Sequence, residues 1–264
     1  MIYLNTVRIK DASRQPDEYP FTLPVVRQPG TLTLKSPVTF FVGENGAGKS
    51  TLLEAIAVAS GSIAVGGEDL VTDSTLRPVR ELASQLALGW RKRTHRGFFL
   101  RVEDFFNFAS RMEASTRELD ELAESYTQPE MSYGARLAQG AMRGKRPALT
   151  RNYGANLHTR SHGEAFLQVF QSRFVPGGLY LLDEPDTALS PLRQLAFLAM
   201  LSDMVQQEAQ FIIASHSPML MAFAEATIFK FDEHGITGIE WHENDNVILM
   251  RDFLNNPELF LRQL

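Results

Sequence analysis

Nine consecutive residues have the types and spacing of a phosphate-binding loop. They read G-E-N-G-A-G-K-S-T and are Gly43, Glu44, Asn45, Gly46, Ala47, Gly48, Lys49, Ser50 and Thr51. Glycines let the backbone turn tightly enough to aim several N–H groups at one anion. Lys49 is expected to reach the β- and γ-phosphates of a nucleotide, and the Ser50 hydroxyl to ligate Mg²⁺.

The residues on either side of this loop provide the context that it requires. An apolar, β-rich run at 38–42 precedes the loop, and an amphipathic run at 52–57 follows it. A strand, a glycine-rich loop and a helix in this order form a phosphate-binding unit, and the helix N-terminus adds about half a positive charge. The sequence therefore predicts a nucleotide site here.

A second segment supplies carboxylates. Residues 179–186 read L-Y-L-L-D-E-P-D, an apolar strand that ends in acidic residues. Ligands bind at the carboxyl ends of the strands in open α/β sheets. Asp183 is expected to hold Mg²⁺, and Glu184 to orient or deprotonate an attacking water. The alternative is a solvated acidic turn, and the phosphate loop upstream favours the functional interpretation.

Two further segments carry polar groups that suit a triphosphate. His216 follows the apolar run F-I-I-A-S, and from there it can donate to a γ-phosphate oxygen and sense its presence. Residues 161–164 read S-H-G-E, a capping box in which Ser161 caps a helix and Glu164 reaches back. A helix start with an exposed Gly163 N–H is also an anion site.

The composition is that of an ordinary soluble globular protein. The chain has 264 residues, a hydrophobic share of 44%, a net charge of -5 and no cysteine, which excludes disulfides, thiolate metal sites and Cys nucleophiles. The acidic balance argues against a wholly basic nucleic-acid binder. Neither a secretory signal nor an apolar run of membrane-spanning length is visible. A cytoplasmic protein that does not insert into a membrane is expected.

Hydrophobic patterning predicts alternating strands and helices around a proline-rich loop. Strands are expected at 2–10, twice within 31–42, and at 97–102, 178–183, 210–214, 227–231 and 236–241, the last two joined by a hairpin-like turn. Helices are expected from Lys49, around 78–90, at 192–207 and from Val247.

The chain is predicted to be a single domain over 1–264. Residues 1–103 and 166–264 would form the nucleotide-binding core, and 104–165 a helical insert over it. The insert is acidic near 113–124, and the stretch 131–163 has no acidic residue. Arg136, Arg143, Lys145, Arg146, Arg151 and Arg160 all lie in this second stretch.

Together these motifs resemble those of the ABC-type ATPases, over most of the chain. Asp183-Glu184-Pro185 looks like the Walker B motif and catalytic glutamate of that family, and His216 like its switch histidine. The segment 161–164 lies where the family has its signature sequence. The resemblance implies an α/β P-loop NTPase with a mostly parallel central sheet, an N-terminal antiparallel β part and a helical insert.

The same resemblance implies that ATP and Mg²⁺ bind between two head-to-tail protomers. Ser161 and Gly163 would then serve the γ-phosphate of the other protomer. The S-H-G-E variant looks more like the soluble RecF, SMC and OLD-like groups than like transporters. Glu103 stands where the family has its Q-loop glutamine, and it is carried as a Mg²⁺ contact. Ser190 replaces the D-loop aspartate, and Tyr19 and Phe21 are candidates for stacking on adenine.

The main hypothesis is a soluble Mg²⁺-dependent ATPase, at least transiently a homodimer, that couples hydrolysis to conformational change in an unknown protein partner. One alternative is the ATP-binding subunit of an ABC transporter. Another is a nucleotide-gated nucleic-acid-binding module in repair or defence, for which 131–163 and the basic residues of 91–96 are the candidate contacts. A kinase fits less well, because no acceptor-substrate site is evident.

Overall fold

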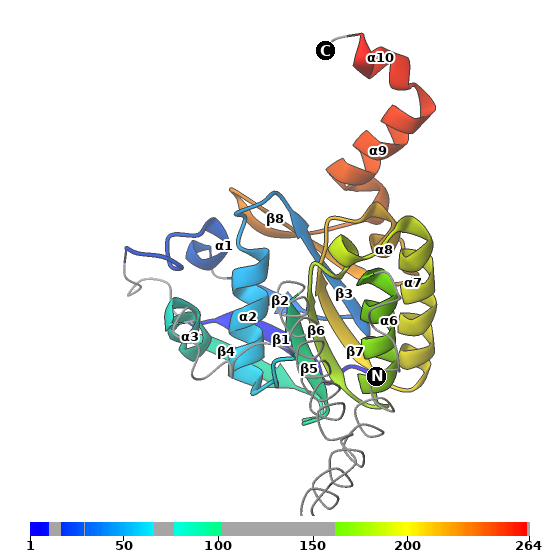
Figure 1. Ribbon diagram of the computed structural model, residues 1–264. Helices are drawn as coiled ribbons and strands as arrows, with labels where there is room; N and C mark the ends of the chain where they lie inside the picture. The colour runs from blue at the N-terminus through cyan, green and yellow to red at the C-terminus, as the bar shows by residue number, and fades with distance from the viewer. Residues whose placement is uncertain (11–16, 29, 66–76, 102–161, 263–264) are drawn as a thin grey trace, which may run out of the picture.

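The computed structural model describes residues 1–10, 17–28, 30–65, 77–101 and 162–262, and these contain two β-sheets (Figure 1). The larger sheet has the strand order β5-β6-β7-β3-β8-β9, and the smaller one the order β2-β1-β4. The strands are β1 (Leu4–Ile9), β2 (Thr31–Thr33), β3 (Val38–Gly43), β4 (Leu86–Trp90), β5 (Gly97–Arg101), β6 (Leu179–Asp183), β7 (Gln210–Ala214), β8 (Thr227–Asp232) and β9 (Gly235–Ile239).

Helices cover both faces of the larger sheet. On one side α2 lies between the two sheets, and on the other side α6, α7 and α8 pack together (Figure 1). The helices are α1 (Pro24–Arg27), α2 (Lys49–Ser60), α3 (Arg77–Ser84), α6 (His162–Arg173), η4 (Pro185–Ala188), α7 (Pro191–Gln206), α8 (Pro218–Met221), η5 (Trp241–Glu243), α9 (Asp245–Asn255) and α10 (Pro257–Leu261).

The larger sheet is mostly parallel and buried on both faces. Neighbouring strands from β5 to β8 run parallel, and β9 returns antiparallel to β8. Side chains of one strand point alternately to opposite faces. Phe41 therefore packs with α2, whereas Phe40 and Val42 pack with the helices of the opposite face. The predicted α/β fold with a mostly parallel sheet is confirmed.

The smaller sheet is antiparallel, as predicted for the N-terminal part. A buried glutamine at the start of β7 fastens it to the larger sheet. Gln210 Oε1 accepts hydrogen bonds from the backbone N–H groups of Tyr3 and Leu4, at 2.7 and 2.9 Å, and its Nε2 donates to Leu4 O at 2.8 Å. A buried amide with both ends paired fixes the position of β1 without an unsatisfied polar group.

The prediction of a helix at 78–90 is wrong in its second half. The helix α3 ends at Ser84, and Leu86–Trp90 form β4, which pairs antiparallel with β1. Leucine and alanine favour helices in isolation, but local preference yields to tertiary pairing. Gly89 also suits this strand, because a Cβ there would lie 2.2 Å from Thr6 Oγ1 on β1.

Candidate functional site

The phosphate loop connects the end of β3 to the start of α2. Glycines occupy its positions with positive φ, 139° at Gly43, 81° at Gly46 and 93° at Gly48. At Gly48 a side chain is excluded twice over, because its Cβ would also lie 2.8 Å from Val25 Cγ2. The backbone N–H groups at the start of a helix have no partner within that helix, which makes this end of α2 a site for an anion.

Lys49 lies at the start of α2 and turns back toward the loop. Its Nζ donates hydrogen bonds to the carbonyl oxygens of Gly43, at 2.8 Å, and Glu44, at 2.9 Å. The residue is 4% exposed, and burial lowers the pKa of its ammonium, against the opposite influence of the Glu184 and Asp183 carboxylates. A desolvated ammonium held by carbonyl groups is a strong partner for a phosphate.

Ser50 and Asp183 meet where α2 approaches the end of β6. The Ser50 hydroxyl donates to Asp183 Oδ1 at 2.9 Å, across 133 residues of sequence. Burial raises the pKa of Asp183 to about 6, the Ser50 hydrogen bond opposes this rise, and the charge of Glu184 adds to it. A hydroxyl oxygen and a carboxylate oxygen side by side are ligands that suit Mg²⁺.

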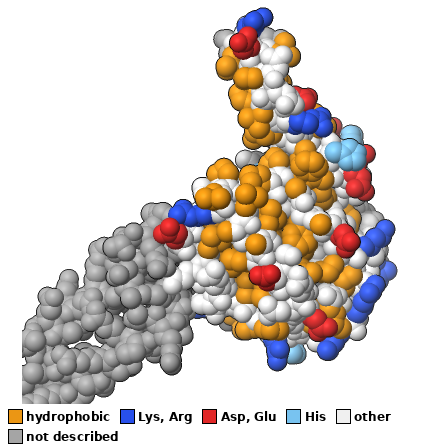
Figure 2. Space-filling view, turned by 90° about the vertical axis from the view of Figure 1, so that its right-hand side faces the viewer, with side chains coloured by type: hydrophobic (Ala, Val, Ile, Leu, Met, Phe, Trp, Pro, Cys, Tyr) orange, Lys and Arg blue, Asp and Glu red, His pale blue; other side chains and the backbone are white. Residues whose placement is uncertain are grey.

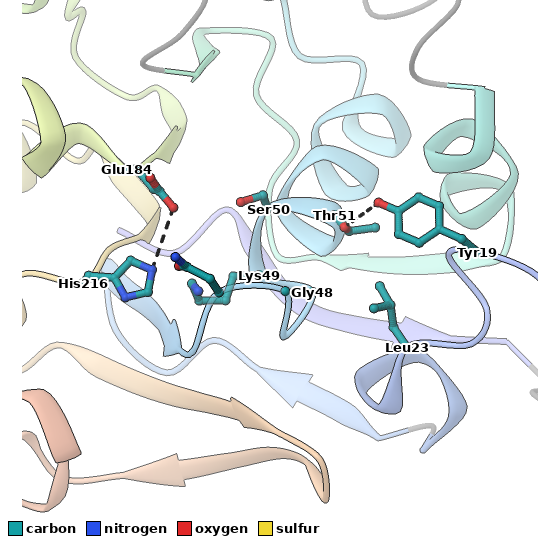
Figure 3. Close-up of a pocket in the computed structure, with 10 residues that line it drawn as sticks. Tyr19, Leu23, Gly48, Lys49, Ser50, Thr51, Glu184 and His216 are labelled. Carbon is teal, nitrogen blue, oxygen red and sulfur yellow. Dashed lines mark hydrogen bonds and ion pairs between the residues drawn. The ribbon is translucent and has the colours of Figure 1, made fainter.

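Glu184 follows β6 in a conformation that is unusual for a residue with a side chain. Its φ of 51° and ψ of 47° are left-handed, and its N–H donates to Ala214 O on β7 at 2.9 Å. Such strain persists only where the surroundings impose it, and it is concentrated at functional sites. The turn directs the Glu184 carboxylate toward His216, whose Nε2 is 3.8 Å from Glu184 Oε1 (Figure 3).

His216 Nε2 is a buried polar atom without a hydrogen-bond partner among the described residues. Buried polar groups are rarely left without a hydrogen-bond partner, so an unpaired one indicates a position where a ligand could bind. The atom lies on the same side of the site as Lys49 and Glu184 (Figure 3). A phosphate oxygen between these three side chains would complete its hydrogen bonding.

A hydrogen-bond network joins the His216 segment to the turn after β6 and to α7. Ser215, which is fully buried, donates to Asp186 Oδ1 at 2.7 Å and accepts from the Ser217 N–H at 3.0 Å. Ser217 Oγ in turn donates to Gln194 Oε1 at 2.6 Å, and Gln194 Nε2 donates to Leu189 O at 3.1 Å. The sequence interpretation did not single out these residues. Only their proximity to the two motifs in the chain could have drawn attention to them.

These segments surround one cavity of about 500 Å³, a volume typical of small-molecule sites. It is lined by Tyr19, Leu23, Asn45, Gly46, Gly48, Lys49, Ser50, Thr51, Glu184 and His216 (Figure 3). Of the two aromatic candidates, Tyr19 lines the cavity and shares a 2.9 Å hydrogen bond with Thr51 Oγ1. Phe21 is 4% exposed and packs in the core between the sheets, so it has no face free for a base.

An ion pair that the sequence interpretation missed lies next to the acidic strand end. Arg101, the last residue of β5, is paired in register with Asp183 and lies 2.7 Å from Glu54 Oε1 on α2 through its Nη2. Its charge lowers the pKa of Asp183. Glu103, the predicted Q-loop counterpart, lies outside the described residues. The Arg101–Glu54 ion pair lies at the end of β5, within the described residues.

The signature-like segment is described only in part, because Ser161 lies outside the described residues. Gly163 is buried at the start of α6 and packs so closely against η4 and α7 that a Cβ would lie 2.8 Å from Ala188 O. Glu164 forms a 3.1 Å ion pair with Arg193 on α7. Neither residue lines the cavity of its own chain.

Residues 23–72 match the family model of the AAA domain. This range contains the whole phosphate loop and all of α2, the elements on which the cavity is built. Over this range the chain is similar to the AAA domain family, whose match includes the phosphate loop. The match and the mostly parallel sheet both agree with the predicted resemblance to P-loop ATPases. No curated protein matches this chain in sequence.

Solved structures of similar proteins are distant in sequence. The Smc head domain from Pyrococcus furiosus, bound to the C-terminal domain of ScpA, is 11% identical with a TM-score of 0.47, over 97% of this chain and 100% of that chain. CbiO1 from Clostridium perfringens, part of the ABC transporter complex cbiONQ, is 15% identical with a TM-score of 0.45, over 100% of both chains.

The ATP-binding cassette MJ0796, in a dimeric post-hydrolysis state bound to ADP and Pi, is also 15% identical, with a TM-score of 0.45 over 91% of this chain and 99% of that chain. All of these TM-scores are below 0.5. The functional interpretation therefore depends on the AAA match and on the geometry of the site itself.

Proposed function

We propose that this protein is a P-loop ATPase that hydrolyses ATP to ADP and phosphate with the help of Mg²⁺. The observation that supports this most directly is the convergence of three motif-bearing segments on one cavity. Lys49, Asp183, Glu184 and His216 come from the phosphate loop and from the ends of β6 and β7, and Ser50 bridges two of these segments. A site that only bound nucleotide would need the lysine loop but not the strained glutamate.

Each side chain has a role that its position supports. Lys49 would contact the β- and γ-phosphates, and the N-terminus of α2 would neutralise part of their charge. Glu184 would accept a proton from the water that attacks the γ-phosphorus in line, as the anhydride bond to the β-phosphate oxygen breaks. His216 Nε2–H would donate to a γ-phosphate oxygen.

The donor set at Ser50 and Asp183 fits Mg²⁺. Both atoms are oxygens, they are 2.9 Å apart, and Mg²⁺ is commonly held by one or two such protein groups together with phosphates. When bound, the metal would supply positive charge that offsets the negative charge of the phosphates. Arg101 and its Glu54 partner would hold the Asp183 end of this donor set in place.

A head-to-tail dimer is the arrangement that the family resemblance implies for hydrolysis. Gly163 does not line the cavity of its own chain, which is in keeping with a role toward a second protomer. The coupling of turnover to an unknown protein partner is part of the same proposal. No helix among the described residues is both long and apolar enough to cross a bilayer.

Neither alternative function is favoured over this one by a feature of the described residues. The exposed basic residues of 91–96 are partly engaged within the chain. Arg91 Nε donates to Asn5 Oδ1 at 3.0 Å, Arg96 Nη1 donates to Pro176 O at 3.2 Å, and Arg93 lies 5.8 Å above the ring of Trp90. The stretch 131–163 lies almost wholly outside the described residues.

Phosphate release in the presence of Mg²⁺ and ATP tests the proposed reaction, with thermal unfolding as a measure of binding. Lys49→Ala should lose both the release of phosphate and the rise in Tm that a bound ligand produces. Lys35→Ala, a change of an exposed lysine away from the cavity, should retain both. Removal of Mg²⁺ with EDTA should stop wild-type turnover. An unchanged rate for Lys49→Ala would reject the proposal.

A further inference from the structure

The last two helices form an arm that extends away from the body of the molecule (Figure 1). This arm comprises α9 and α10, residues 245–261. It exposes large apolar side chains to an unusual degree, with exposed fractions from 36% to 69%. They are Leu249, Met250, Phe253, Leu254, Leu259 and Leu261.

Hydrogen bonds and an ion pair attach the arm to the body, and an aromatic contact joins its two helices. At its root, Asn244 Oδ1 accepts the N–H groups of Asn246 and Val247, and Lys230 Nζ lies 2.6 Å from Asp245 Oδ2. Further out, the Phe253 and Phe260 rings meet edge to face at 5.7 Å, which holds α10 against α9. The exposed apolar surface therefore belongs to a structured helix pair.

Hydrophobic side chains gather along the arm in the space-filling view, on the side of the molecule that shows α7 (Figure 2). Exposed apolar area costs roughly 25 cal/mol per Å² relative to a buried position. Contiguous apolar surface on a soluble protein commonly marks an interaction site. Val247 is the buried residue of α9, so the outer part of this helix contributes little to the core of its own chain.

The balance of positive and negative charge on the arm favours a protein partner over nucleic acid or an anionic membrane. Asp245 at the start of the arm is neutralised by Lys230 of the body. Further out, Arg251 is paired with Asp252 at 3.3 Å, and Glu258 is paired at 3.0 Å with Arg262, the residue that follows the arm. These two pairs sum to zero charge. Binding to nucleic acid or to an anionic lipid surface would require an excess of basic residues on the polar face. A protein surface that is itself apolar and charge-balanced fits better.

A second copy of the same arm has these properties. In a two-fold symmetric contact the same patch meets itself, so it must be self-complementary. Arg251 and Asp252 are neighbours of opposite charge and satisfy this requirement. Arg251 of one copy can face Asp252 of the second copy, and Asp252 of the first can face Arg251 of the second. We propose that the arm pairs with the arm of a second copy and forms a homodimer contact that does not require nucleotide.

This contact goes beyond the proposed ATPase function and does not depend on it. If both hold, the arm has a consequence for the reaction. Two tethered cores are held at a high effective concentration, so that ATP would need only to close them rather than to recruit a partner from solution.

The chain contains no cysteine, which allows a direct test by cross-linking. Leu254→Cys, studied in full-length protein freed of nucleotide, introduces the sole thiol at the centre of the arm. Oxidation should convert most of this variant to a disulfide-linked dimer. Ile63→Cys is the matched control, because Ile63 on the body and Leu254 have the same exposed fraction of 69%. It should remain monomeric on a denaturing gel, and equal cross-linking of both variants would overturn the proposal.

Sedimentation equilibrium without nucleotide provides the second measurement. Wild-type protein should dimerise, and Leu254→Asp should raise the dissociation constant at least tenfold, whereas Ile63→Asp should leave it unchanged. Arg251→Asp and Asp252→Arg should each weaken the dimer, and the double exchange should restore it. A wild-type protein that stays monomeric at every concentration, or an arm that instead binds anionic vesicles, would overturn the assignment. Circular dichroism checks that each variant is folded.

Discussion

The Ser215 hydroxyl donates a 2.7 Å hydrogen bond to Asp186 Oδ1, and this bond joins the segment of His216 to the turn of Glu184. Each of the two residues is adjacent or close in sequence to a proposed functional side chain. The bond is partly buried, since Ser215 is fully buried and Asp186 is half-buried. It therefore fixes the separation between the proposed base and the proposed γ-phosphate contact from outside the cavity itself.

Removing the acceptor should slow turnover without weakening ATP binding. Asp186→Ala breaks the bond, and a small displacement of Glu184 is expected to lower kcat by roughly tenfold while the KM for ATP stays within about twofold. Asp186→Asn keeps an acceptor oxygen for Ser215 and should retain most of the activity. Asp203→Ala, on the exposed surface of α7, is the control. Parallel changes in KM and kcat would indicate a general structural defect instead.

Glu184 is expected to be essential for hydrolysis but not for binding. Glu184→Gln cannot accept the proton of the attacking water, so kcat should fall by about 100-fold or more. ATP should still raise the Tm, and a closed dimer should accumulate with Mg²⁺ and ATP in size-exclusion chromatography with light scattering. Glu233→Gln, in the exposed turn between β8 and β9, should behave as wild type. Normal phosphate release by Glu184→Gln would remove the residue from the mechanism.

Local patterns predicted the elements on which the site is built. The strand, loop and helix around Lys49 form one continuous segment, and the strands that end at Asp183 and before His216 are short apolar runs with polar ends. The hairpin of β8 and β9 also follows from a local turn signal, and it is confirmed. In each case the residues that decide the structure are neighbours in the chain, so a single sequence contains the information.

The contacts that sequence reasoning missed join distant segments. Gln210 fastens β1 across more than 200 positions, and Arg101 meets Glu54 only because β5 and α2 pack together. Nothing near Gln210 in the sequence marks it as a tie between sheets. The strand β4 was missed for the same reason, since its pairing with β1 decides the conformation of a segment with helical preference. Predictions that fall within 102–161 remain predictions.

The raised pKa of Asp183 makes a prediction about stability in the absence of metal and nucleotide. A carboxyl whose pKa rises from 3.8 to about 6 on folding destabilises the native state at any pH where it is ionised. Asp183→Asn should therefore raise the free energy of unfolding at pH 8, by up to roughly 3 kcal/mol at 1.36 kcal/mol per pKa unit. The amide oxygen that this substitution introduces can still accept the hydrogen bond from Ser50.

This gain should shrink as the pH falls from above 6 toward 4 and disappear only below 3.8, where the wild-type carboxyl is protonated in both states. Urea unfolding at a series of pH values, with EDTA present, measures the difference. A gain that is the same at every pH would show that the substitution acts through packing rather than through the charge of Asp183.

Gly163 offers a way to separate packing within one chain from a role toward a second protomer. A Cβ at this position would lie 2.8 Å from Ala188 O and 2.9 Å from Arg193 Cδ, so Gly163→Ala should displace the start of α6 and cost about 1–3 kcal/mol of stability. Gly238→Ala, where a Cβ meets nothing within 4 Å, should be nearly neutral. Thermal unfolding without nucleotide measures this packing cost. If Gly163 also serves the ATP of a second protomer, Gly163→Ala combined with Glu184→Gln should lose the ATP-induced closed dimer at temperatures where it remains folded. A variant as stable as wild type that still closes normally would contradict both roles.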